Sequence, residues 1–229
     1  MGYSKEEVQE FMNNTLKPDD TFTFQCQACG DCCRKRDTPI LMTGMDVFRM
    51  AQALNMKPMD VTSKYMRTYL GDDSHIPLFV LKERDDGSCS LLHKSKCSVH
   101  SKKPVVCAIY PLGRYFDVKE NSIQYFKQDN VCRAAEKAGK VWTLNEWLDA
   151  FGIRELDSMS KAWYKLMSGI TQAMCKVEKN KIDPIMYALL AQILYWNYDI
   201  SKKYEDEVAL NMEHAKVVFN RLYKIDFKF

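Results

Sequence analysis

One short stretch, Cys26-Gln27-Ala28-Cys29-Gly30-Asp31-Cys32-Cys33, places four thiols within eight residues of this 229-residue chain. Two-residue spacings fold a chain back on itself, so that several sulfurs face one ion. Gly30 permits the turn and lets backbone amides approach the sulfurs. Neighbouring cysteines such as Cys32 and Cys33 usually direct their sulfurs apart, so we expect them to bridge two ions or to serve two centres. The stretch predicts a metal-binding loop around which the N-terminal part is built.

Four further cysteines extend this pattern along the chain. They are far apart in sequence and lack close partners, so we expect the fold to bring them over the loop in one or two compact clusters. Eight thiolates divide into two sets of four. That number suits two zinc sites, one [4Fe–4S] cluster with a further ion, or a polynuclear centre. The predicted metal ligands are Cys26, Cys29, Cys32, Cys33, Cys89, Cys97, Cys107 and Cys132.

The spacing also bears on the kind of metal. The C-x2-C-x2-C run is closer to a ferredoxin cluster loop than to the separated C-x2-C pairs of zinc fingers, which favours an iron–sulfur cluster over zinc or iron ions. Sulfurs that share a tetrahedral zinc should lie under ~4 Å apart, and sulfurs on an iron–sulfur cube should lie farther apart. The ninth cysteine, Cys175, stands alone beside apolar residues and is predicted to be a buried structural thiol.

Composition limits the class of protein. Hydrophobic residues make up 46% of the chain and charged residues 28%, which excludes disordered and collagen-like proteins. The formal net charge of +3 argues against a general nucleic-acid-binding protein. Acidic residues near the N-terminus argue against a signal peptide, and no apolar run approaches the ~18 residues of a membrane span. We therefore expect a cytoplasmic protein whose reduced thiols bind metal instead of forming disulfides.

The remaining patterns predict a mainly α fold with small β-hairpins. We expect a metal-stapled, cysteine-rich domain over 1–140, packed on an all-helical domain over 141–229, and the two could share one core. The helices over 43–55 and 58–70 should form an intervening excursion whose ends lie close together. Periodicity, capping boxes and turns predict helices over 5–14, 43–55, 58–70, 104–110, 144–151, 156–177, 184–196 and 208–222, a strand over 21–24, and hairpins joining 77–81 to 89–92 and 115–118 to 123–126.

The ordered motifs resemble those of the YkgJ-like cysteine-cluster family. The similarity lies in Cys26-x2-Cys29-Gly30-x-Cys32-Cys33-Arg34, Cys89, Cys97-x2-His100, Pro104-x2-Cys107 and Tyr110-Pro111, over about residues 22–133. That family is described as a zinc- or iron-chelating domain, and it includes relatives of flagellin lysine-N-methylase. The chain departs from the family at Lys103, where arginine is usual, and at His100, where an aromatic residue is common. The resemblance implies a metal-binding cysteine cluster without implying one reaction.

Three functions fit these observations. The first is a metal-cluster protein whose iron–sulfur cluster, or zinc or iron ions, serve electron transfer or metal-assisted chemistry. The second is an interaction module with structural zinc, whose C-terminal helices dock a protein partner. The third, implied by the resemblance, is a protein-modifying enzyme such as a protein lysine N-methylase. Basic residues near the cysteines are interpreted as offsetting thiolate charge, so nucleic acid is not an expected partner, and no catalytic residue is identified.

Overall fold

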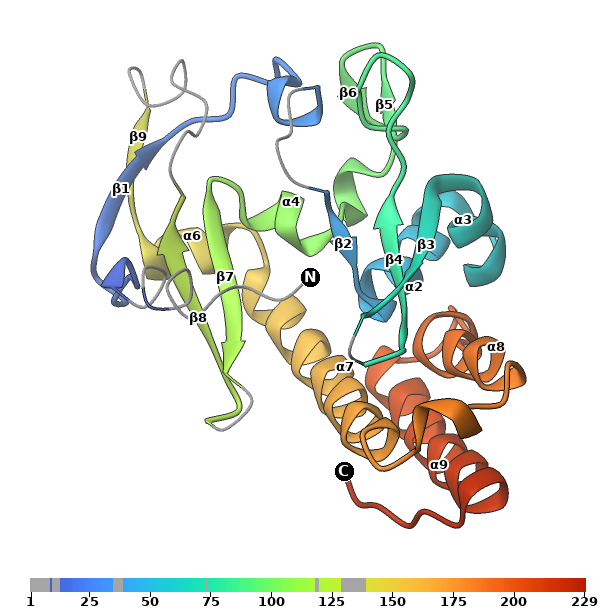
Figure 1. The fold of residues 1–229 in the computed structure, drawn as a ribbon. Coiled ribbons are helices and arrows are strands. Elements are labelled where there is room, and N and C mark those ends of the chain that lie inside the picture. Colours follow the sequence, from blue (N-terminus) through green and yellow to red (C-terminus); the bar gives the residue numbers. More distant parts are fainter. Residues whose placement is uncertain (1–8, 10–12, 35–38, 73, 118–119, 129–138) are drawn as a thin grey trace. The chain divides into compact units, whose positions relative to one another are not determined.

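The chain is described by a computed structural model (Figure 1), which covers residues 9, 13–34, 39–72, 74–117, 120–128 and 139–229. Small antiparallel sheets lie among helices, as the sequence predicts for a mainly α protein with β-hairpins. The residues form two compact units, each made from two separate segments. Unit 1 consists of Met1–Thr38 and Glu83–Ser158, and unit 2 of Pro39–Lys82 and Met159–Phe229. The domain boundary expected after residue 140 stays a prediction.

Unit 1 begins with a two-stranded ribbon that pairs distant parts of the sequence. Strand β1 (Thr21–Phe24), which the sequence predicts, pairs antiparallel with β9 (Lys140–Thr143). Its alternation buries Phe22 and Phe24, whose rings meet Trp147 edge-on at centroid distances of 5.4 and 5.7 Å. Trp147 belongs to helix α6 (Leu144–Ala150), which starts at the predicted capping box. The ribbon and this helix form an aromatic core in unit 1.

A second hairpin in unit 1 confirms another prediction. Strands β7 (Leu112–Asp117) and β8 (Ser122–Lys127) pair over six residues, longer than the sequence predicts. Residue 118, the end of the first predicted strand, lies outside the described residues, as does most of the predicted helix over 5–14. Helix α4 (Val105–Ile109) precedes β7 and carries Cys107. Two shorter strands, β5 (Leu92–His93) and β6 (Lys96–Cys97), form a third hairpin, followed by a 3-10 turn, η2 (His100–Lys102).

The predicted pairing of 77–81 with 89–92 is wrong. Strand β4 (Pro77–Leu81) instead lies at the centre of a sheet in unit 2, between β2 (Leu41–Met42) and β3 (Met66–Leu70). Both edges of β4 are therefore occupied. The segment that follows the turn makes an isolated bridge between Glu83 and Cys89, and from Leu92 it pairs with β6 instead.

The helices of the first half of unit 2 are close to the prediction, with one correction. Helix α2 (Gly44–Leu54) begins at the capping box of Thr43 and Asp46. Helix α3 (Pro58–Tyr65) ends five residues earlier than predicted, because the following residues pair with β4 as strand β3. The excursion closes as expected, since the amide of Leu81 donates to the carbonyl of Ile40 at 3.0 Å.

The remaining helices of unit 2 follow the predicted apolar periodicity. Helix α7 (Ile153–Met174) begins in unit 1 and continues into unit 2, where it is followed by a 3-10 turn, η3 (Lys179–Lys181). Helix α8 (Ile185–Ala191) runs into a π-helical turn, η4 (Gln192–Trp196), and α9 (Tyr204–Tyr223) completes the chain's helices. None of the helices in the described part of the chain combines the length and apolar character needed to cross a bilayer.

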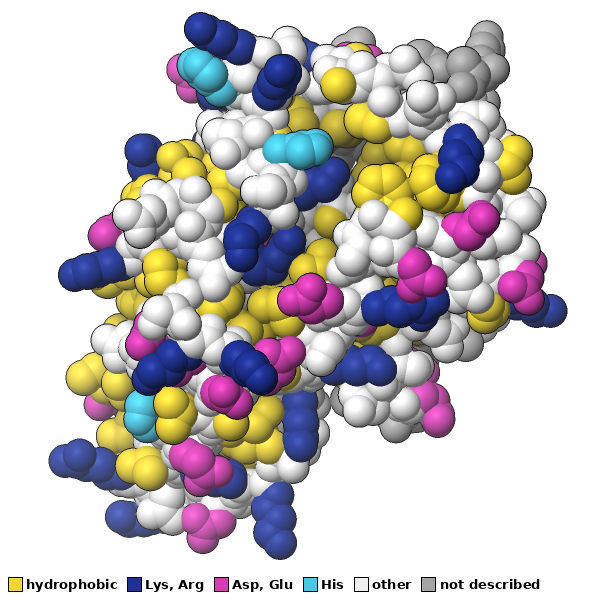
Figure 2. All heavy atoms as spheres, turned by 180° about the vertical axis from the view of Figure 1, so that it is seen from behind, with side chains coloured by type: hydrophobic (Ala, Val, Ile, Leu, Met, Phe, Trp, Pro, Cys, Tyr) yellow, Lys and Arg dark blue, Asp and Glu magenta, His cyan; other side chains and the backbone are white. Residues whose placement is uncertain are grey.

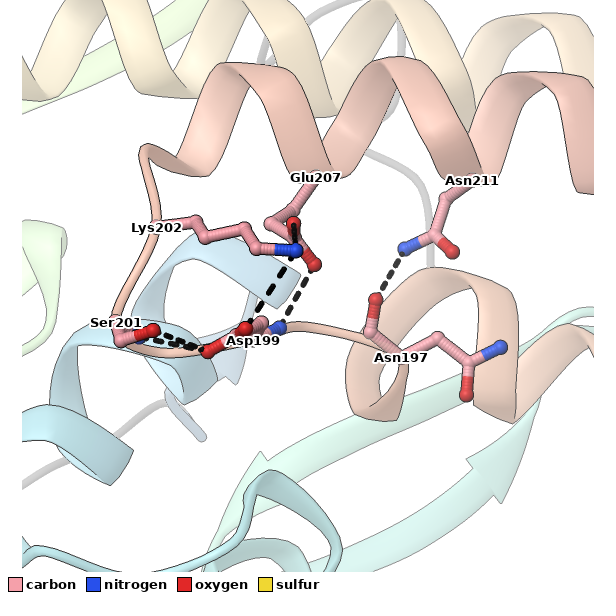
Figure 3. Close-up of polar contacts among 6 residues, drawn as sticks. All are labelled: Asn197, Asp199, Ser201, Lys202, Glu207 and Asn211. Carbon is pink, nitrogen blue, oxygen red and sulfur yellow. Dashed lines mark hydrogen bonds and ion pairs between the residues drawn. The ribbon is translucent and has the colours of Figure 1, made fainter.

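The loop between η4 and α9 is fixed by side chains of α9 (Figure 3). A carboxylate oxygen of Glu207 accepts from the amide of Asp199 at 2.8 Å, and Asn211 donates to the carbonyl of Asn197 at 2.9 Å. The ammonium of Lys202 lies 3.6 Å from Asp199 and 3.8 Å from Glu207. The Glu207 side chain is only 7% exposed, so its carboxylate is largely shielded from water. The hydrogen bond and the nearby ammonium compensate for this buried charge.

Candidate metal centre

The predicted metal-binding loop is a compact turn in unit 1. Gly30 adopts a left-handed conformation with φ of 75°, and the amide of Cys33 donates to its carbonyl at 3.0 Å. This closes the 3-10 turn η1 (Asp31–Cys33), as the glycine in the motif predicts. At the other end, the amide of Ala28 donates to the sulfur of Cys26 at 3.4 Å. Cys26, Cys29 and Cys32 are exposed, and Cys33 is half-buried.

Two long-range contacts bring other segments to this loop. The amide of Cys89 donates to the carbonyl of Cys33 at 2.7 Å. The guanidinium of Arg34 donates to the carbonyl of Cys29 at 2.7 Å and to the Ser95 hydroxyl, at the tip of the β5–β6 hairpin, at 2.9 Å. Arg34 therefore links the loop to the hairpin that carries Cys97. The sequence indicates only that this arginine lies near the cysteines, since its partner is 61 residues away.

The sulfurs of Cys32 and Cys33 lie together, 3.9 Å apart. The expectation that neighbouring cysteines point their sulfurs apart is therefore wrong here. It holds for an extended strand, in which successive side chains alternate between two faces. In a 3-10 turn successive side chains are separated by only about 120°, so that both sulfurs can lie on one side.

The thiols of five cysteines interact electrostatically. A hydrogen bond with Cys33 is the main cause that lowers the pKa of Cys32 to about 6, and the charge of Lys103 acts in the same direction. The pKa of Cys33 is raised by that hydrogen bond, by burial and by the neighbouring thiols of Cys32, Cys89 and Cys107. Burial is the main cause that raises the pKa of Cys97, with a further contribution from Cys89. We call these five residues the thiol cluster: Cys32, Cys33, Cys89, Cys97 and Cys107.

The other predicted ligands are not part of the thiol cluster. Cys26 and Cys29 lie in the same loop but are exposed, and Cys132 lies outside the described residues. Cys175 was predicted to be buried and is exposed, because the buried stripe here runs through Ala173, Met174 and Val177 and leaves residue 175 outside it. No disulfide joins the eight described cysteines. Among the described side chains, no three His, Cys, Asp or Glu residues are positioned to hold an ion as they stand.

The chemistry of the donor set fits a zinc or iron centre. Thiolates are soft ligands and bind Zn²⁺ and iron in preference to Mg²⁺ or Ca²⁺. Lys103 offsets thiolate charge at Cys32 and Cys97, which is the role expected of basic residues around an anionic centre. His93 and His100, the histidines nearest to Cys97 in sequence, are exposed. The donor atoms of the thiol cluster are therefore of the kind that suits such an ion.

Comparison with known proteins agrees with this chemistry. Residues 25–133 match a family model, CxxCxxCC, whose description reads "Putative zinc- or iron-chelating domain". The match covers the loop and all of the predicted ligands that follow it in unit 1, and it confirms the resemblance to the cysteine-cluster family. No curated protein matches the chain. No solved structure matches it either.

Proposed function

We propose that this chain holds a zinc or iron ion through the thiolates of Cys32, Cys33, Cys89 and Cys107, because residues 25–133 match the model of a zinc- or iron-chelating family. Cys33 is the centre of this set, since its thiol interacts with the other three. Bound in this way, the ion supplies a structural cross-link between segments that are far apart in sequence.

One distance supports an ion over an iron–sulfur cube. Two thiolates on a tetrahedral ion with bonds of ~2.3 Å are separated by about 3.8 Å. The sulfurs of Cys32 and Cys33 are 3.9 Å apart. In a [4Fe–4S] cluster each cysteine binds a different iron, so its sulfurs lie farther apart. The spacing of the loop in the sequence favours the cluster, and the geometry of the vicinal pair favours the ion.

The proposal is tested by purifying the protein without oxygen and measuring its zinc, iron and acid-labile sulfide. We expect zinc or iron without sulfide in the wild-type chain. Cys33→Ser should retain less than about a tenth of the metal, since it removes the central ligand. Cys175→Ser is the matched control and should retain all of it, because that thiol lies in unit 2.

Circular dichroism of Cys33→Ser should show the helices of unit 2 still formed, so that loss of metal is not loss of the whole fold. A chain that contains neither zinc nor iron, or a Cys33→Ser chain that keeps its full metal, would contradict the proposal. A brown protein with stoichiometric sulfide would contradict the proposed ion and show that the chain holds an iron–sulfur cluster.

A further inference from the structure

The segment that carries the thiol cluster has an unusual distribution of charge. From residue 87 to residue 116 the chain contains no Asp or Glu, although the whole sequence has 30 of them. The same segment contains the basic residues Lys94, Lys96, Lys102, Lys103 and Arg114, together with His93 and His100. A near-neutral chain therefore carries a locally cationic segment around its candidate metal centre.

These basic residues divide into two groups. Lys103 acts on the thiols of Cys32 and Cys97, and Arg114 forms a buried ion pair with Asp157. By contrast, Lys94 and Lys96 are exposed, and neither forms an ion pair with a carboxylate of the described residues. Basic side chains (Lys or Arg) and His side chains lie together at the upper left of Figure 2, next to an acidic one. We call the exposed group the cationic surface: His93, Lys94, Lys96 and His100.

The tip of the β5–β6 hairpin holds this surface in a strained conformation. Lys94 and Ser95 have φ of 45° and 65°, in the left-handed region. A two-residue hairpin with positive φ at both positions normally uses Asn-Gly, because other residues cost free energy there. The bond from Arg34 to Ser95 fixes the tip to the metal-binding loop. Strain at a lysine with no structural partner among the described residues points to a functional position.

We propose that the cationic surface docks an acidic protein segment, one that presents several carboxylates, beside the thiol centre. This inference rests on the proposed function, since it names the partner of the same site. Exposed lysines of one sign steer and orient a partner of the opposite charge.

The composition of the surface favours a protein partner over nucleic acid. Residues 92–103 contain no Phe, Tyr, Trp or Arg, the side chains on which single-strand binders mainly stack their bases. A hairpin tip is also convex, whereas a small anion needs donors that converge on it. Carboxylates spread over a protein surface require neither feature, and lysine ammonium groups pair with them as point charges.

The test uses the full metal-loaded chain and two labelled probes at low salt. One probe is a ten-residue peptide of alternating Asp and Glu, and the other is a ten-nucleotide oligothymidine. Fluorescence anisotropy should show binding of the peptide that weakens with added salt. Lys94→Glu with Lys96→Glu should weaken it by about tenfold or more. The control, Lys176→Glu with Lys179→Glu, makes the same charge change at exposed residues of unit 2. It should change the affinity for the peptide less than about twofold.

Several outcomes would overturn the docking surface. These are tighter binding of the oligothymidine, equal weakening in both variants, or no peptide binding at all. Loss of metal from the Lys94→Glu, Lys96→Glu chain would also overturn it, because the lysines would then serve the centre itself. Metal analysis of the wild-type chain separates the two proposals: a metal-free chain that still binds the peptide through Lys94 and Lys96 contradicts the proposed function alone.

Discussion

At the scale of single residues, Cys33 contacts several segments of the candidate centre that are far apart in sequence. Its carbonyl accepts from the amide of Cys89, and its sulfur lies 3.9 Å from that of Cys32. Its thiol also interacts with Cys107 in helix α4. Thiolate coordination at Cys33 would therefore fix the positions of a loop, a turn and a helix at once. This is the physical reason why Cys33→Ser is the decisive variant for metal binding.

Arg114 supplies a prediction about buried charge. Its side chain is 5% exposed and lies 2.9 Å from Asp157, whose second oxygen accepts from the Tyr125 hydroxyl at 2.5 Å. Burial and the charge of Asp157 raise the pKa of Tyr125, so this hydroxyl stays protonated and donates. Arg114→Met leaves the carboxylate without its cation and should lower the free energy of unfolding by about 3 kcal/mol.

The matched control for this variant is an exposed ion pair in the same unit. Arg154 and Asp149 are 53% and 63% exposed, so that Arg154→Met should cost less than about 1 kcal/mol. Urea unfolding followed by circular dichroism compares the two variants. If both variants lost the same free energy of unfolding, the ion pair of Arg114 and Asp157 would be screened by solvent like a surface pair.

Whether the sequence predicts the contacts of a single residue depends on how far apart the two partners are along the chain. The turn at Gly30 follows from local spacing and is confirmed. The pairing of Arg114 with Asp157 joins residues 43 apart, and no local pattern encodes it. Cys175 has an apolar neighbour on its helix, but it lies outside the buried stripe that continues past it.

At the scale of elements, the start of helix α2 shows how a local signal and a long-range contact act at one place. The capping box of Thr43 and Asp46 is a local pattern and is confirmed. The residue after it, Gly44, matters for a reason that is not local. A Cβ there would lie 2.1 Å from the carbonyl oxygen of Leu194 and 2.7 Å from side-chain atoms of Trp163 and Tyr198. Helix α2 and the η4 turn are thus packed backbone against backbone.

Gly44→Ala is therefore expected to destabilise the protein, although alanine is the better helix former by about 1 kcal/mol. The clashing oxygen belongs to the backbone and cannot move aside, so we expect a loss of about 3 kcal/mol. The control is Ala53→Gly at an exposed position of the same helix, which should cost only about 1 kcal/mol. A thermal melt that shows Gly44→Ala to be neutral or stabilising would contradict this close packing.

The elements that the sequence predicts wrongly share one cause. Residues 66–70 continue the helical spacing of α3, yet they form a strand because β4 offers five pairing positions. Residues 89–92 resemble the second strand of a hairpin, but their expected partner β4 is already paired on both edges. Local periodicity predicts which segments are regular, whereas competition for strand edges decides with which segment they pair.

At the scale of the whole molecule, the chain leaves unit 1 after Thr38 and returns to it at Glu83. The sequence predicts this excursion, because the cysteines on both sides must meet, and its closed ends are confirmed. It does not predict that the excursion joins the C-terminal helices to form unit 2. That assembly depends on apolar faces, such as those of Phe79 and Tyr195 with ring centroids 4.6 Å apart, whose partners no spacing specifies.

The two units should respond differently to removal of metal. Apart from α4, α6 and the start of α7, the described part of unit 1 is built from short strands and loops, and a structural ion contributes on the order of 10 kcal/mol to small folds of that kind. Unit 2 contains α8, α9 and a buried aromatic core that includes Tyr195, Tyr204 and Phe219. We therefore expect a thiol-compatible chelator to speed amide exchange in β5–β8 by at least about a hundredfold, while exchange in α8 and α9 changes little.

Hydrogen-exchange mass spectrometry with and without chelator measures this difference unit by unit. In the Cys33→Ser chain the chelator should add nothing, because its ion is already lost, and this variant controls for effects of the chelator itself. Unchanged exchange in β5–β8 after verified metal removal would show that the strands fold without the ion. Equal acceleration in both units would show that they unfold together as one core, and the ion would then stabilise the entire chain instead of its cysteine-rich unit.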